Sequence, residues 1–293
     1  MTHRPVPTLL MAAALAGLAP AAPGQTAAAQ MPGLAAPASA IPAQTRTARP
    51  APLGDSASDP IARGIAAFGA REPAAALAAF QDALARDSTS YEANWRAALA
   101  CITLGAATPD RVESPARDSL YHSAELYARR AVRADSMGAE GQFVLANALG
   151  RTALTRSRDE RIRLAAEIRS AALRAIALDP RHDGAYHVLG LWNAEIMRLS
   201  GFSRFLARHL MGGGIFGQAS WDGAIDNMRR AVELDSTRIV HHLDLAKIYV
   251  DRKRWGDARA ELDTVTTLPV RDYLDPQYKG EAAALRGRIS GRR

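Results

Sequence analysis

A short pattern of small and apolar residues recurs along the chain, and it constrains the fold more than any other feature. In its fullest form it consists of Ala76, Phe80 and Ala83, which are spaced so that they share one face of an α-helix. The spacing returns at Ala124-Ala128-Ala131, Ile168-Ala172-Ala175, Ala224-Met228-Ala231 and Ala258-Leu262-Val265. Small residues at such positions allow close helix packing, so the pattern predicts a series of similar, closely packed helices.

Four of these helices are followed by related phrases, ARDSTS, RADSMG, ALDPRH and ELDSTR, whose Asp is expected to stop one helix and cap the next. The first positions of successive patterns are 48, 44, 56 and 34 residues apart (124−76, 168−124, 224−168 and 258−224). A tetratricopeptide repeat is about 34 residues long, so these spacings indicate that unit with insertions of 14, 10, 22 and 0 residues. The Leu189-Gly190 pair stands where this repeat has Leu-Gly.

The repeat predicts an all-α fold. We expect about five helical hairpins over residues 60–270, stacked into a right-handed tetratricopeptide-like superhelix, with a capping helix from about Pro276 to Ile289. No alternating β pattern is present. Stacking is required because a single hairpin cannot bury its own apolar face.

The first 58 residues do not share this pattern. Arg4, a short apolar run over 9–19 and the small residues Ala27-Ala28-Ala29 predict a cleaved signal peptide over 1–29, and the alternative is a disordered alanine-rich tail. Residues 30–58 are rich in Pro and Ala and are expected to be a disordered linker, which leaves 59–290 as the repeat domain. The expected location is therefore periplasmic or secreted. No transmembrane segment is expected in the mature chain.

Composition argues against several classes of function. The formal charge is +7, but acidic residues are scattered among the Arg residues, so no nucleic-acid partner is expected. Cys101 is the only cysteine and has apolar neighbours, which favours a buried side chain. We expect no cofactor.

One glycine motif raises the question of nucleotide binding. Gly212, Gly214 and Gly217 match G-x-G-x-x-G. A phosphate-binding loop of that kind follows a strand, whereas residues 201–211 have a helical pattern and Ser220 is a suitable helix N-cap. We therefore interpret the motif as a hinge between helices.

The insertion that contains this motif carries several apolar and aromatic side chains. They could form a lid over the groove, contact a lipid or another apolar ligand, or simply pack against neighbouring hairpins. These residues are Phe202, Phe205, Leu210, Phe216 and Trp221.

Catalytic and metal-binding patterns are weak. His187 and Glu195 are about two helical turns apart, too far for an acid/base pair formed directly by that spacing. His241 and His242 are adjacent and point to different sides of a helix. The sequence contains neither H-E-x-x-H nor G-x-S-x-G, and we expect no enzymatic activity.

Residues 187–196, HVLGLWNAEI, resemble the H-x-L-G-x-W-x-x-E segment of the regulator of microtubule dynamics family. An aromatic and basic insertion, Ala219-Ser220-Trp221 and the phrase AVELD at 231–235 continue the resemblance, which extends to about 290. It implies a tetratricopeptide-like domain used for binding rather than catalysis. Some eukaryotic relatives are associated with microtubules, and others with membrane contact sites and lipid binding.

The favoured interpretation is an exported adaptor that binds a protein or peptide partner in its concave groove. Candidate groove residues lie on the first helix of each hairpin: Asn94, Asn147, His187, Glu195, His242 and Asp244. Two alternatives stay open, a lipid or apolar-ligand binding protein that uses the aromatic insertion at 200–221, and a scaffold of an envelope complex.

Overall fold

The computed structural model describes residues 59–109, 112–153, 156, 158–199 and 214–292, and in these ranges it contains helices and no strand. The all-α prediction is therefore confirmed. The predicted signal peptide and linker lie outside the described residues, as does the first part of the aromatic insertion. No described helix has the length and apolar character needed to cross a membrane.

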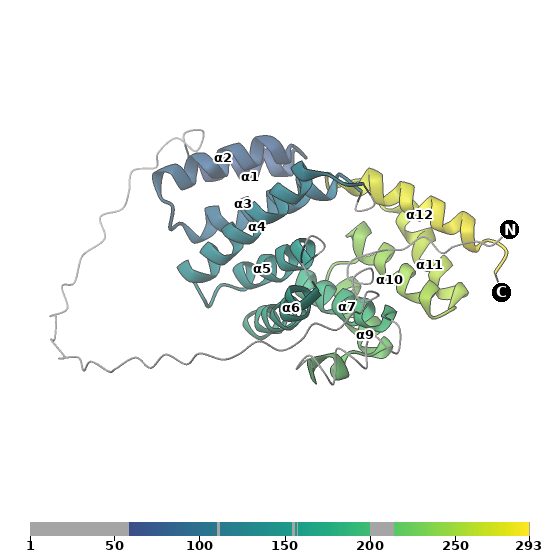
Figure 1. The fold of residues 1–293 in the computed structure, drawn as a ribbon. Coiled ribbons are helices and arrows are strands. Elements are labelled where there is room, and N and C mark those ends of the chain that lie inside the picture. Colours follow the sequence, from purple (N-terminus) through teal and green to yellow (C-terminus); the bar gives the residue numbers. More distant parts are fainter. Residues whose placement is uncertain (1–58, 110–111, 154–155, 157, 200–213, 293) are drawn as a thin grey trace.

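Five helical hairpins follow one another along the described chain, each made of an A helix and a B helix (Figure 1). The A/B pairs are α1 (Pro60–Gly69) and α2 (Pro73–Arg86), α3 (Tyr91–Ala106) and α4 (Pro115–Ala134), α5 (Ala139–Thr152) and α6 (Arg158–Leu178), α7 (Asp183–Arg198) and α9 (Trp221–Leu234), and α10 (Ile239–Asp251) and α11 (Trp255–Thr267). A final helix, α12 (Asp275–Ile289), packs on the last hairpin. This is the predicted superhelix of five hairpins with a capping helix.

The turns between hairpins share one hydrogen-bond pattern, which explains the recurring Asp. Each turn is four residues long, and its first carboxylate accepts a backbone N–H from two residues further on, at 2.8–3.0 Å. The four carboxylates belong to Asp87, Asp135, Asp179 and Asp235. The Asp therefore holds the turn and does not cap the next helix, a role taken by residues such as Ser90, whose hydroxyl accepts the N–H of Ala93.

All the extra residues lie inside hairpins. The turns between hairpins keep their four residues, whereas α4 and α6 are 20 and 21 residues long and α7 is separated from α9 by residues 199–220. Part of that connection is a short 3-10 helix, η3 (Gly214–Gln218). Because the turns between hairpins are constant, successive hairpins can stack in a regular way despite the insertions.

The Leu-Gly position shows why small residues recur in the pattern. A Cβ atom on Gly190 would lie 3.2 Å from the backbone nitrogen of Met228 and 3.3 Å from the backbone oxygen of Ala224. Backbone atoms cannot rotate away, so α7 and α9 pack this closely only because residue 190 has no side chain.

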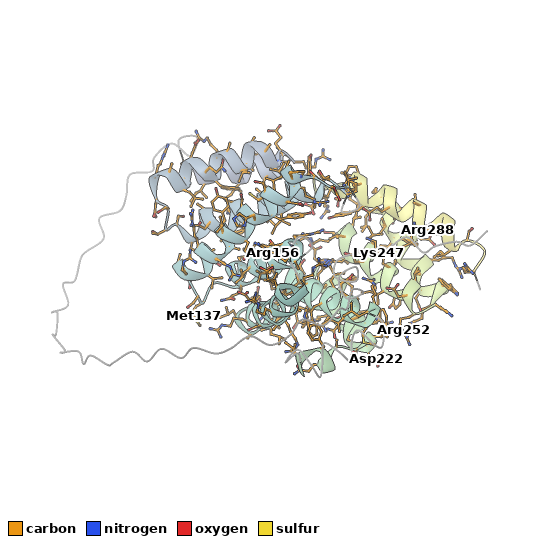
Figure 2. The ribbon with its side chains drawn as sticks, in the orientation of Figure 1. Met137, Arg156, Asp222, Lys247, Arg252 and Arg288 are labelled. Carbon is orange, nitrogen blue, oxygen red and sulfur yellow. The ribbon has the colours of Figure 1, made fainter. Side chains whose placement is uncertain are left out.

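Side chains fill the space between the helices, and Figure 2 shows Lys247 near the middle of the molecule and Met137 at its edge.

The segment that joins α11 to α12, residues 268–274, brings the last repeat back towards the second. We call it the strap. The Asp275 carboxylate, 3% exposed, accepts the backbone N–H groups of Arg271 and Asp272 at 2.8 and 2.7 Å and so fixes its bend. The first turn of α12 reaches α3, where the Gln277 amide donates to the backbone oxygen of Ala106 at 3.4 Å. The strap and the start of α12 thus lie at the concave side of the superhelix, whereas the rest of α12 packs on the last hairpin.

Candidate functional site

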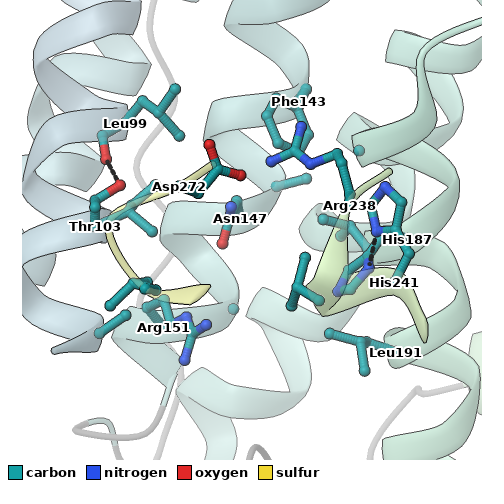
Figure 3. A pocket seen from close by; sticks show the side chains of 18 of the residues that line it. Leu99, Thr103, Phe143, Asn147, Arg151, His187, Leu191, Arg238, His241 and Asp272 are labelled. Atoms are coloured by element: carbon teal, nitrogen blue, oxygen red, sulfur yellow. Dashed lines mark hydrogen bonds between the residues drawn. The ribbon is translucent and has the colours of Figure 1, made fainter. Parts of the chain in front are cut away.

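A cavity of about 190 Å³ lies on the concave side, between the A helices and the strap (Figure 3). Side chains from α1, α3, α5, α7 and the start of α10 form its walls, and Tyr273, Leu274 and Tyr278 add to them from the strap and α12. Most of the lining is apolar or aromatic, including Leu99, Ile102, Phe143, Val188, Leu191 and Trp192. Such a lining favours a ligand that carries apolar groups.

Polar side chains interrupt this lining on one wall. Figure 3 shows Asn147 of α5 between Thr103 of α3 and His187 of α7. The Thr103 hydroxyl donates to the backbone oxygen of Leu99 at 2.9 Å, so it is already engaged. The half-buried amide of Asn147 has no hydrogen bond to any described residue. Asn147 therefore offers one donor group and one acceptor atom to an occupant of the cavity.

A chain of ionisable side chains runs from α7 through α10 behind His187. His241 Nε2 lies 2.8 Å from Asp183 Oδ2, and His241 Nδ1 lies 2.7 Å from His187 Nδ1. His187 Nε2 lies 3.2 Å from Asp244 Oδ2. On the far side of Asp244, Lys247 Nζ lies 2.9 Å from that carboxylate and 3.1 Å from Glu281 of α12.

The carboxylates and the buried imidazole of this chain have shifted pKa values. Burial opposes ionisation of Asp183, but the hydrogen bond with His241 and the charge of Arg238 outweigh it and hold the pKa well below its usual range. The pKa of Asp244 is also far below its usual range, because Lys247 and His187 outweigh the cost of burial. Burial and the neighbouring His187 lower the pKa of His241 to about 4. Both carboxylates are therefore ionised at neutral pH.

Three of the predicted groove residues line the cavity. They are Asn147, His187 and Glu195, and the last pairs with Arg198, which also binds Asp251 at 2.6 Å. Asp244 does not line the cavity but holds His187 from behind. Whether any of these residues binds a partner stays a prediction.

The other two predicted groove residues are used within the fold. The amide of Asn94, which is fully buried, donates to the backbone oxygens of Ser88 and Ser90 at 3.0 and 2.8 Å. His242 makes the equivalent contact, since its Nε2 lies 3.0 Å from the backbone oxygen of Ser236. Burial disfavours the charged form of His242, but the hydrogen bonds to Glu261 and Ser236 outweigh it and raise its pKa. Both side chains lie outside the cavity and stabilise turns between hairpins.

The aromatic insertion is only partly described. Phe202, Phe205 and Leu210 lie outside the described residues, so the lid stays a prediction. Phe216 is 7% exposed and packs into the same apolar cluster as Trp192, whereas Trp221 is half-buried beside the last two hairpins. Gly214 and Gly217 of the glycine motif lie in η3, between α7 and α9, whereas Gly212 lies outside the described residues.

No arrangement of catalytic or metal-ligating groups stands out in the described part. Among the described residues, no three His, Cys, Asp or Glu side chains could hold a metal ion together. Cys101 is buried, and burial raises the pKa of its thiol to about 12, as suits an inert core residue.

The apolar wall of the cavity was missed by reasoning from repeat position alone. Part of the wall lies at a fixed distance in sequence from the Asp of each turn between hairpins. The residue 12 positions after Asp87, Asp135 and Asp179 is, respectively, Leu99, Asn147 and Leu191, and all three line the cavity. No local signal could have found the position of the strap, because the contact of the following helix α12 with α3 depends on the curvature of the whole superhelix.

Comparisons with known proteins agree with this architecture. The structure of TTC0263, a thermophilic TPR protein of Thermus thermophilus, has a TM-score of 0.54 at 18% identity and covers 77% of this chain and 96% of that chain. The pilF protein of Pseudomonas aeruginosa has a TM-score of 0.44 at 14% identity, over 78% and 90% of the two chains. The likeness to TTC0263 shows the fold alone, and no curated protein matches the chain.

The sequence model of a protein family gives the more specific result. The model of regulator of microtubule dynamics protein 1-3 matches residues 67–290, which include all five A helices at least in part and the strap. The match covers well over half of the 293 residues. This chain is a tetratricopeptide-like member of the regulator of microtubule dynamics family.

Proposed function

We propose that this protein is a helical-repeat adaptor that binds an extended segment of a protein partner in its concave groove. One or two apolar side chains of the segment enter the cavity, and the Asn147 amide holds a backbone group beside them. The observation that carries this proposal is an apolar cavity whose wall presents the Asn147 amide, which makes no hydrogen bond within the described part of the chain. A backbone peptide group has the donor and the acceptor that this amide can pair with.

The size of the cavity favours side chains over a whole lipid. Pockets that enclose a small-molecule ligand usually have volumes of about 300–1,000 Å³. The cavity, at about 190 Å³, is smaller and suits one or two apolar side chains. Buried apolar anchors of this kind usually supply most of the binding energy of an interface.

Peptide selection on the purified protein tests the proposal. We expect a random peptide library to yield sequences with one or two large apolar residues that bind the wild type. The Leu191→Arg variant places a charge in the cavity wall and should bind them at least tenfold more weakly. The Leu126→Arg variant is the control, because Leu126 is 45% exposed on α4 and does not line the cavity. Equal affinity for wild type and Leu191→Arg would refute the proposal.

A lipid or another apolar ligand is the second candidate, and the partly enclosed apolar lining favours it. Native mass spectrometry of the purified protein separates the two. A co-purifying apolar molecule, present in the wild type and in Leu126→Arg but lost in Leu191→Arg, would replace the peptide proposal. We expect a mass without ligand in all three proteins.

Export is part of the proposal and rests on the sequence of the first 29 residues. We expect the mature protein to begin between about residues 22 and 30 and to fractionate outside the cytoplasm. N-terminal sequencing of the protein from fractionated cells tests this, and an intact Met1 on the cytoplasmic protein would contradict it.

A further inference from the structure

The contacts between Asp183, His241, His187 and Asp244 form a row of three hydrogen-bonding positions, and the number of protons in it can be counted. Each contact needs one proton. A carboxylate can only accept, and the contact between the two Nδ1 atoms needs one donor and one acceptor. Two neutral imidazoles bring only two protons, and two charged imidazoles bring four. All three hydrogen bonds of the row can form when the two rings together hold three protons.

The two extreme protonation states each leave a conflict. With both rings neutral and both carboxylates ionised, one of the three contacts brings two acceptors together. With both rings charged, two N–H groups face each other across the 2.7 Å between the Nδ1 atoms of His187 and His241. One added proton removes the first conflict without creating the second.

We propose that His187 and His241 together form a binding site for a single shared proton, which joins α7 to α10 at the wall of the cavity. The rings lie close enough to act as one group, because their centroids are 4.8 Å apart. His241 is 1% exposed and His187 is largely buried, so the shared proton is sheltered from water. Such a pair takes up protons in two separate steps that belong to both rings.

The charges around the pair favour one added proton over none or two. Arg238 lies 3.4 Å from Asp183, and Lys247 bridges Asp244 and Glu281. With neutral rings, these three carboxylates and two cations carry a net charge of −1 (−3 + 2). One proton on the pair makes this set of charges neutral, and a second makes it positive, which the burial of the two imidazoles disfavours.

Other ionisable groups border this cluster without entering it. One is Tyr278 of α12, whose pKa is raised by burial to about 12, and two more are His182 and Asp272. His182 caps α7, where its Nδ1 accepts the N–H of Ala185 at 3.2 Å, and its Nε2 lies 3.5 Å from Glu140. Asp272 on the strap lies near Arg238, and burial raises its pKa although the charge of Arg238 acts in the opposite direction. Neither His182 nor Asp272 contacts an imidazole of the pair. Both therefore modulate the proton affinity of the site without changing the number of protons that its three hydrogen bonds need.

Imidazole ¹⁵N NMR of the full chain, recorded from pH 8 to pH 4, tests the proposal. Spectra of His187→Gln and His241→Gln assign the two rings, and the exposed His122 serves as the reference. We expect the two rings to titrate together and to share one added proton. The second proton should enter at least two pH units lower. Independent titration, with each ring taking a proton within one pH unit of the other, would overturn the proposal, as would no uptake above pH 4.

A pair of carboxamide variants checks that the carboxylates hold the site. Asp183→Asn removes one ionised acceptor, and we expect the first proton to bind at least tenfold more weakly. Glu140→Gln is the control, because its carboxylate faces His182 and not the pair, and it should leave both steps unchanged. An unchanged first step in Asp183→Asn would also overturn the proposal.

Discussion

At the scale of the residue, much of the polar chemistry of this protein holds turns. The amide of Asn94 binds two backbone oxygens of the turn that precedes its helix, and Gln142 and His242 repeat part of that contact six residues after Ser136 and Ser236. A buried donor or acceptor left unpaired costs about 1–3 kcal/mol. Residues that sequence position assigns to a binding groove can therefore be essential to the fold.

The Asn94→Ala variant tests this role. It leaves two turn carbonyls without their partner, so we expect the free energy of unfolding in urea to fall by about 1–3 kcal/mol. Asn227→Ala is the matched control, because the Asn227 amide bonds only to the oxygen of Gly223 in its own helix. A loss no larger than that of the control would contradict the assignment of Asn94 to the turn.

The pH dependence of stability includes the step in which the His187–His241 pair takes its second proton. The lowered pKa of His241, about 4 against the usual 6.5, belongs to this step, so the stability that the uncharged imidazole contributes is present above pH 6.5 and is lost as the pH falls towards 4. The loss should reach about 3 kcal/mol. The raised pKa of His242 acts in the opposite direction, because its contribution is present below pH 6.5.

Urea unfolding of the wild type and of His241→Gln between pH 7 and 4 separates these contributions. We expect the wild type to lose more stability over that range than the variant does. Asp183 and Asp244 do not interfere with this comparison. Their pKa values are lowered, so the stability that the two carboxylates contribute is lost only below about pH 4. Parallel curves for the two proteins would contradict the lowered pKa of His241.

At the scale of the element, helices that touch backbone to backbone are the most sensitive to added volume. Gly190→Val would place its Cβ about 3.2 Å from the backbone of Met228, so we expect a loss of about 1–3 kcal/mol and a lower Tm. Gly280→Val on α12 is the control, because its Cβ would meet nothing within 4 Å. Calorimetry of both variants measures the difference, and equal Tm values would refute the close contact.

The strap is the element that closes the cavity, and its bend depends on one buried carboxylate. Asp275→Ala removes the acceptor of the N–H groups of Arg271 and Asp272. We expect hydrogen exchange of these two amides to become at least tenfold faster, while amides in the middle of α10 keep their protection. Asp272→Ala changes an exposed neighbour and should leave the exchange slow.

At the scale of the whole molecule, the sequence predicts what is repeated and local. The helical spacing and the Asp turns predicted the hairpins, because both act within a few residues of the chain. The cavity depends on contacts such as that between Gln277 and Ala106, which are 171 residues apart and follow from the curvature of the stack. Position in the repeat pointed to Asn147, His187 and Glu195, which line the cavity. It also pointed to Asn94 and His242, and it could not show that these two side chains bind turns outside the cavity.

Methyl NMR of a selected peptide complex shows whether the cavity on the concave side receives apolar side chains of a partner. We predict that chemical shifts change at the methyl groups of Leu99, Ile102, Val188 and Leu191, which line the cavity. The methyl groups of Leu126 and Leu173, exposed on the B helices α4 and α6, should not change. Shift changes confined to Leu126 and Leu173 would place the partner on the opposite face and contradict the proposed function.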